Sequence, residues 1–296
     1  MRNCQDDIQF CKTSIHAYTF ISEWTTSLGY QASESAAKMG YNYLVIPLRF
    51  PQKIFPSEIS LMMEEFNLEP IVTSNSPFSD DVSSIDKDVW NRGMARHRNA
   101  FNLARDMGAR KVSGILYGAF GKANTRASSE NLKRSAEAIS ILAEEAGKKG
   151  LSLSIEIVNR YESNLLNTVQ QALEYFSSLN SDKVLLHLDT FHMNIEESNL
   201  LGAIKDSLPF LTYFEMNQNN RGSFDQGLID FNPMFNLLKQ EKFSGIIGVE
   251  GFSSAISAPL VAGGVCAWRP LFERGEEVAY SAMEIIKKHF SSKISR

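Results

Sequence analysis

Short apolar runs rich in β-branched residues alternate with longer amphipathic segments along almost the whole chain, and this alternation limits the possible folds. Eight runs are predicted as strands, at residues 14–21, 43–48, 70–74, 111–117, 151–157, 183–189, 211–217 and 245–251. Helices are predicted around them, at residues 30–39, 57–66, 88–107, 129–148, 168–178, 232–240 and 271–290. No linker rich in Pro, Gly or Ser interrupts the series, so we predict one (β/α)8 TIM barrel domain over residues 1–296, with residues 1–12 as an amino-terminal extension.

A doubly wound parallel sheet is the main competing fold. That fold usually carries a Gly-rich first turn, and the chain contains neither a GxGxxG nor a Walker sequence. The absence of both patterns favours the barrel.

Charge and cysteine content exclude several classes of function. Thirty basic against 34 acidic residues leave a formal charge of −4, which argues against a general nucleic-acid binder. No segment reaches the roughly 18–20 consecutive apolar residues that a membrane span needs, and the first residues lack the apolar core of a secretory signal. Cys4, Cys11 and Cys266 follow no zinc or disulfide spacing. We therefore expect a cytoplasmic protein that binds no membrane.

Four acids mark the ends of the last four predicted strands: Glu156, Asp189, Glu215 and Glu250. In a (β/α)8 barrel the carboxyl ends of all strands meet at one face, where barrel enzymes carry out their chemistry. One acid at a strand end is most often an exposed residue or an ion-pair partner. Four acids converging on one mouth would repel one another unless a cation joined them, and oxygen ligands favour Mg2+ or Mn2+ over zinc. The pattern therefore predicts a metal site.

The histidines show no metal-ligand spacing. His97 and His289 lie in predicted helices and are expected at the surface. His187 alternates with Asp189 along one strand, so we expect it to support the metal site from inside the barrel rather than to bind the metal.

The segments around the acids resemble a known family, the ketose 3-epimerases of the D-tagatose and D-allulose 3-epimerase type, which are xylose-isomerase-like barrels. The similar segments are IEIVNRYESNLLNT (155–168), LDTFHMNIEE (188–197), FEMNQNNR (214–221) and VEGF (249–252). LDTFHMNIEE is the most specific of them. IHAYTFISEW (15–24) and AWRPLF (267–272) also look like family segments, so the resemblance covers nearly the whole chain.

The resemblance implies roles for individual residues. Glu156, Asp189 and Glu250 match three of the family's ligands to one divalent metal ion, Mn2+ or Mg2+. Glu156 and Glu250 also match its two acid/base glutamates. The family's fourth ligand is a histidine, whereas this chain has Glu215, which we predict to be the fourth ligand. The additional negative charge is expected to favour hard cations and to raise the pKa of at least one carboxyl in the metal-free protein.

The resemblance also implies a small sugar as substrate and a homodimer or homotetramer as the assembly. Glu162, His192 and Arg221 match residues that hydrogen-bond the sugar, and Trp24 matches an aromatic that packs over it. Gln218 replaces a family glutamate, and SFDQG (223–227) replaces a more basic turn. These changes lie on the loop that also carries Arg221, close to the expected substrate position.

The leading functional prediction is a metal-dependent epimerase or isomerase of a ketose or a related small hydroxy-ketone. A metal ion would stabilise an enediolate while Glu156 and Glu250 exchange protons on opposite faces of the carbon. Proton return to the same carbon is epimerisation, and relay to the neighbouring carbon is aldose–ketose isomerisation. A non-catalytic sugar-binding barrel and a metal-dependent dehydratase or lyase remain as alternatives. A phosphorylated substrate, contacted by Arg269 and the Gly263–Gly264 pair, also stays open.

Overall fold

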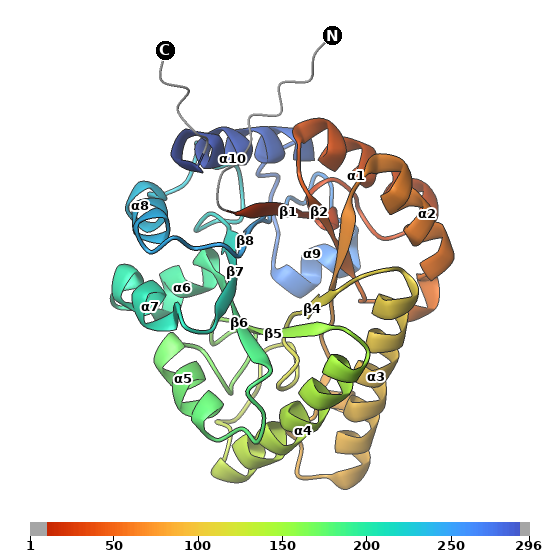
Figure 1. Cartoon of the computed structure of the whole chain (residues 1–296), viewed down its shortest axis with the longest axis vertical. Helices are drawn as coiled ribbons and strands as arrows, with labels where there is room; N and C mark the ends of the chain where they lie inside the picture. Colours follow the sequence, from red (N-terminus) through yellow and green to blue (C-terminus); the bar gives the residue numbers. More distant parts are fainter. Residues whose placement is uncertain (1–10, 291–296) are drawn as a thin grey trace.

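Eight parallel strands close into a barrel, with each strand paired to the next and β8 paired back to β1 (Figure 1). The computed structural model describes residues 11–290. The strands are β1 (Lys12–His16), β2 (Tyr43–Pro47), β3 (Glu69–Thr73), β4 (Lys111–Ser113), β5 (Ser152–Ile157), β6 (Val184–Asp189), β7 (Leu211–Met216) and β8 (Ile246–Val249). The predicted (β/α)8 barrel is confirmed, and the doubly wound alternative is excluded.

Helices follow the strands, and in the view of Figure 1 most of them lie around the outside of the barrel, whereas the short helix Pro259–Val265 lies within the ring of strands. They are α1 (Thr26–Met39), α2 (Pro56–Phe66), α3 (Lys87–Asp106), α4 (Ser129–Lys148), α5 (Val169–Ser177), α6 (Thr190–Glu196), α7 (Leu200–Ser207), α8 (Asn232–Gln240), α9 (Pro259–Val265) and α10 (Gly275–Phe290). Ser128 and Thr168 begin α4 and α5 with reciprocal capping boxes, as their sequence positions indicate. Among the described helices, none combines the length and the apolar character needed to cross a membrane.

The first strand differs most from its prediction. It spans Lys12–His16 rather than residues 14–21, because the His16 ring accepts a hydrogen bond from the Tyr18 backbone amide and the chain turns into a 3-10 helix over Ala17–Thr19. Strand β4 also ends early, at Ser113, because Gly114 adopts a φ of 112° that does not continue a strand. The predicted extension falls outside the described residues, apart from residues 11 and 12.

The inside of the barrel is apolar at one level and polar at the next. A buried cluster fills the level nearer the amino ends of the strands: Tyr43, Val45, Ile71, Tyr213 and Ile246. Side chains alternate between the two faces of a strand, so the next inward-facing positions lie closer to the carboxyl ends. These positions include the predicted acids, which the barrel therefore places together at its mouth.

Candidate metal and acid–base centre

The structure brings the four predicted acids together at the carboxyl ends of β5 to β8. Oxygen atoms of Asp189, Glu215 and Glu250 lie within 4.8 Å of one another. Glu156 forms a second group of this kind with His187 and Glu215, and a third with Asp189 and a histidine of α6, His192. Three overlapping groups of oxygen and nitrogen ligands at one barrel mouth form a candidate site for a metal ion.

Burial and mutual repulsion make the acid cluster unfavourable without a cation. Burial raises the pKa of Glu156 and of Glu250 well above the usual range, and the neighbouring carboxylates raise it further. Burial and the Asp189 carboxylate raise the pKa of Glu215 to about 8. Burial also raises the pKa of Asp189, although the Arg221 guanidinium opposes this shift. These shifts fit the expectation of a raised pKa from the sequence, and a divalent cation would offset their common cause.

Asn217 joins two of the acids and was not predicted as a site residue. Its side-chain amide donates to Asp189 Oδ2 at 3.1 Å and to Glu250 Oε2 at 3.0 Å. Its own Oδ1 is buried and has no hydrogen-bond partner among the described residues. This free acceptor adds another oxygen beside the acid cluster, where a cation or a hydroxyl group could use it.

His192 lies between the acids and Arg221. Its Nδ1 accepts the Asn159 backbone N–H at 3.2 Å, and its Nε2 lies 3.2 Å from Arg221 Nη2, a group that can only donate. Nε2 also lies 3.6 Å from Glu156 Oε1 and 3.9 Å from Glu162 Oε2. Burial and the Arg221 charge lower the pKa of His192 well below its usual range, which keeps the ring neutral. His192 is therefore a neutral ring at the mouth of the barrel that contacts both Arg221 and the acids.

Arg221 is held rigidly beside the same acids. Its Nη2 donates to Glu162 Oε1 at 3.1 Å, and its guanidinium lies 4.1 Å from the centre of the Phe191 ring and 5.3 Å from that of Phe252. The Arg221 backbone has a φ of 61°, a conformation that non-glycine residues rarely adopt. Its buried Nε has no partner among the described residues. Three residues predicted to contact a sugar, Glu162, His192 and Arg221, thus lie together.

His16 is a neutral donor that the sequence did not identify. Its Nδ1 accepts the Tyr18 backbone N–H at 3.2 Å, which leaves the ring proton on Nε2, 4.0 Å from Glu250 Oε1. Burial and the charge of Arg221 lower the pKa of His16 to about 3. Each predicted acid/base glutamate therefore has the Nε2 atom of a neutral histidine within 4.0 Å. The sequence gives little indication of this role, because the tautomer of His16 depends on its contact with the Tyr18 backbone amide.

Trp24, the predicted aromatic contact of the sugar, is buried against α1. It is only 3% exposed, and its ring packs so closely on Gly29 of α1 that a Cβ there would lie 2.8 Å from the indole. The packing accounts for most of its surface, so a contact with substrate stays a prediction. The expectation for two histidines is wrong, because His97 and His289 are both buried rather than exposed.

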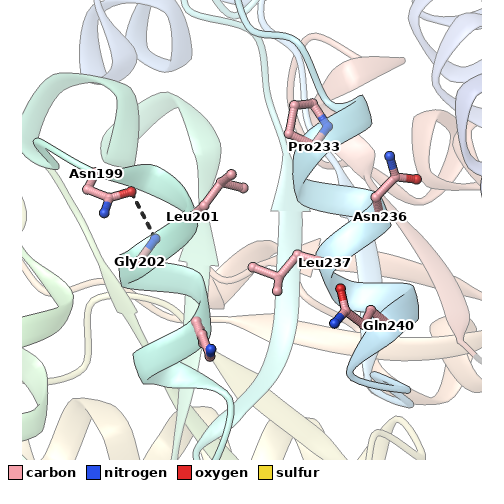
Figure 2. Close-up of a pocket in the computed structure, with 8 residues that line it drawn as sticks. Asn199, Leu201, Gly202, Pro233, Asn236, Leu237 and Gln240 are labelled. Atoms are coloured by element: carbon pink, nitrogen blue, oxygen red, sulfur yellow. Dashed lines mark hydrogen bonds between the residues drawn. The ribbon is translucent and has the colours of Figure 1, made fainter.

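A groove on the outside of the barrel offers none of this chemistry. It lies between α7 and α8, has a volume of about 380 Å³ and is lined by Asn199, Leu201, Gly202, Lys205, Pro233, Asn236, Leu237 and Gln240 (Figure 2). These residues include no carboxylate and no histidine. The acid–base chemistry of the described residues therefore belongs to the barrel mouth.

Known proteins are similar to this chain in both sequence and fold. The family described as xylose isomerase-like TIM barrel matches residues 33–288. An L-ribulose 3-epimerase from Methylomonas sp. (strain DH-1) is 33% identical over 275 residues, covering 93% of this chain and 96% of the relative. A ketose 3-epimerase from Arthrobacter globiformis is 32% identical over 254 residues, 86% of this chain and 88% of the relative. The crystal structure of D-allulose 3-epimerase from Methylomonas sp. in complex with D-allulose superposes with a TM-score of 0.91 at 32% identity, covering 95% of this chain and 98% of that one.

Proposed function

Because the chain belongs to the ketose 3-epimerases within the xylose isomerase-like TIM barrels, we propose that it is a metal-dependent 3-epimerase of a free ketose such as L-ribulose or D-allulose. One observation carries the proposal. Glu156 on β5 and Glu250 after β8 border the same acid cluster from two sides, and each lies within 4.0 Å of the Nε2 atom of its own neutral histidine. A binding protein without catalysis has no use for such a pair.

Glu156, Asp189, Glu215 and Glu250 would hold one Mn2+ or Mg2+ ion. The donor set fits a hard cation because it consists of carboxylate oxygens, and because the buried acids repel one another when they are ionised. When bound, such an ion stabilises the negative charge that develops on the sugar oxygens during proton removal.

Glu156 and Glu250 would exchange the proton at carbon 3. In the metal-free protein, burial and neighbouring carboxylates raise the pKa of each. The exchange requires one of the two to be ionised and the other to carry a proton. The ionised glutamate then removes the proton from one face of the carbon, and the protonated glutamate delivers one to the other face. The Nε2 atoms of His192 and His16 lie 3.6 Å and 4.0 Å from these glutamates, where the two rings could orient sugar hydroxyls.

The charge of the site favours an unphosphorylated sugar. Arg221 is already paired with Glu162, and the acid cluster would repel a phosphate. The residues considered for phosphate contact support this choice, because Arg269 is exposed and Gly263–Gly264 lies within α9 rather than in a turn. Glu162, His192 and Arg221 would instead bind sugar hydroxyl and carbonyl oxygens.

Proton exchange in D2O tests the proposal. The purified protein is incubated with Mn2+ and either L-ribulose or D-allulose, and NMR follows deuterium incorporation and product formation. We expect deuterium at carbon 3 together with the 3-epimer, and loss of both by a factor of about 10³ or more in Glu156→Gln. Glu64→Gln, the same change at an exposed glutamate of α2, is the matched control and should exchange like the wild type.

Other outcomes identify the alternatives. Exchange at carbons 1 and 2 with an aldose product would replace epimerisation with isomerisation. Loss of water from the sugar would indicate a lyase, and sugar binding without exchange would indicate a non-catalytic barrel.

A further inference from the structure

We propose that Tyr213 and His187 are positioning residues that fix the Glu215 carboxylate for the metal ion. This inference rests on the proposed function, because it assumes that Glu215 is a metal ligand. It concerns two residues inside the barrel to which the proposed function assigns no role.

One hydrogen-bond chain reaches Glu215 from β1. The Ser14 hydroxyl donates to the Tyr213 hydroxyl at 2.9 Å, and the Tyr213 hydroxyl donates to Glu215 Oε1 at 3.0 Å. All three side chains are buried. The first oxygen of Glu215 therefore has a donor whose own oxygen is held in place.

A second chain reaches Glu215 from the opposite side of the barrel. Ser154 of β5 donates to the Ser113 hydroxyl at 3.1 Å, and Ser113 Oγ lies 2.9 Å from His187 Nδ1. Since the Ser113 oxygen already accepts a hydrogen bond, its proton is free for Nδ1, and the ring proton of His187 is then on Nε2. Nε2 lies 3.1 Å from Glu215 Oε2. Both chains thus end with a donor on a different oxygen of the same carboxylate.

Packing holds the two terminal donors in place. The rings of His187 and Tyr213 are stacked, with centroids 4.0 Å apart and an interplanar angle of 5°. Gly248 of β8 makes room for the tyrosine, because a Cβ at that position would lie 2.2 Å from the Tyr213 ring. The ring therefore has few other positions available, and its hydroxyl stays directed at Glu215.

The arrangement has a function beyond filling the barrel. Burying a carboxylate without hydrogen-bond donors costs free energy, and such a side chain can change rotamer freely. Glu215, in contrast, has a donor on each oxygen. Groups that orient a metal ligand typically change metal affinity about 10- to 100-fold when they are removed. Loss of the Tyr213 hydroxyl should therefore weaken metal binding more than an ordinary buried hydroxyl would.

Tyr213→Phe tests this inference with Mn2+ affinity as the readout, measured calorimetrically without sugar. The matched control is Tyr175→Phe, which removes a buried tyrosine hydroxyl 2.7 Å from Ser135 Oγ, between α5 and α4. We expect Tyr213→Phe to weaken Mn2+ binding about 10- to 100-fold and Tyr175→Phe to leave it unchanged, with similar losses of melting temperature. The EPR spectrum of bound Mn2+ should change in Tyr213→Phe only.

A milder variant covers the case in which Tyr213→Phe does not fold. Ser14→Ala removes only the donor to the tyrosine oxygen, and we expect Mn2+ affinity to fall a few-fold. The inference is overturned if every one of these two variants that folds binds Mn2+ within twofold of the wild type. A different result would reject the proposed function and leave this inference in place: Mn2+ binding that depends on Tyr213 as predicted, in a wild-type protein that exchanges no proton at carbon 3.

Discussion

The two halves of the barrel have the same strand–helix architecture but different chemistry. In β1 to β4 the inward-facing polar groups are neutral, for example His16, Ser14 and Ser113. Inward-facing positions of β5 to β8 carry the acids, including Glu156 and Glu215. The first half therefore supplies neutral polar groups, and the second half supplies the charges together with the donors that contact them directly.

Two buried histidines illustrate the difference. His97 of α3 lies 3.5 Å from Ser74 Oγ and 3.3 Å from Ser76 Oγ, with no carboxylate among these contacts. His187 of β6 contacts a serine on one ring nitrogen and Glu215 on the other. The same residue type is thus a structural connector in the first half and a support for the candidate metal site in the second.

Asp189→Asn should have the largest effect, because Asp189 belongs to two of the three candidate ligand groups. We expect Mn2+ affinity to fall by more than about 100-fold and proton exchange by about 10³-fold or more. The amide keeps an oxygen for the Phe191 backbone N–H, so the fold should persist, as circular dichroism would show. Retention of wild-type affinity would contradict the assignment of the charged function to the second half.

The dependence of stability on pH should differ in sign between the buried histidines and the buried acids in the metal-free protein. The pKa of both His16 and His97 is about 3 in the folded protein, against 6.5 for an unperturbed histidine. Below pH 6.5 the unfolded chain takes up protons that the folded chain does not, so the free energy of unfolding falls toward pH 3. The slope is up to about 1.4 kcal/mol per pH unit for each histidine.

Glu215 should act in the opposite direction. Its pKa is about 8 when folded and 4.5 when unperturbed, so above pH 4.5 the unfolded chain releases a proton that the folded chain keeps. The free energy of unfolding should therefore fall as pH rises from 4.5 to 8. Denaturant titrations between pH 4 and pH 9, with and without Mn2+, check both effects. Mn2+ should raise stability more at pH 8 than at pH 5, and an equal rise at both values would contradict this account.

His97→Leu should have a smaller effect, confined to stability. The substitution leaves two buried serine hydroxyls without their partner, and we expect a loss of about 2 kcal/mol in the free energy of unfolding. The acid-side slope described for the histidines should also become shallower. Mn2+ affinity and proton exchange should stay within twofold of the wild type, and a larger change would show that the halves are coupled.

Much of the fold could be predicted because its signals are local. All eight strands begin within two residues of their predicted starts, since a buried parallel strand is a continuous apolar run between polar turns. The first strand was predicted too long because YTFI looks β-rich, whereas the contact from Tyr18 to His16 bends the chain there. Helices α6, α7 and α9 have only seven or eight residues each and were not predicted.

The acids of the candidate site could be found from their positions at strand ends, but their supports could not. Asn217, His16 and Tyr213 act through contacts with residues far away in the sequence, as the bond between Ser14 and Tyr213 shows. Tyr213 also depends on the space above Gly248, which nothing in the sequence near the tyrosine indicates. These relationships exist only once the barrel is closed.

The pairing of the first strand with the last also decides when the barrel can close during translation. Strand β8 is the last to leave the ribosome, and it pairs with β1, joining Lys12 to Ile246. Glu250 follows that strand directly, so a chain truncated before β8 exposes two unpaired strand edges and lacks the second glutamate. The ring of strands and the acid set are therefore completed together, once β8 and Glu250 have been made, and a nascent chain that stops before them cannot hold the metal ion with all four acids.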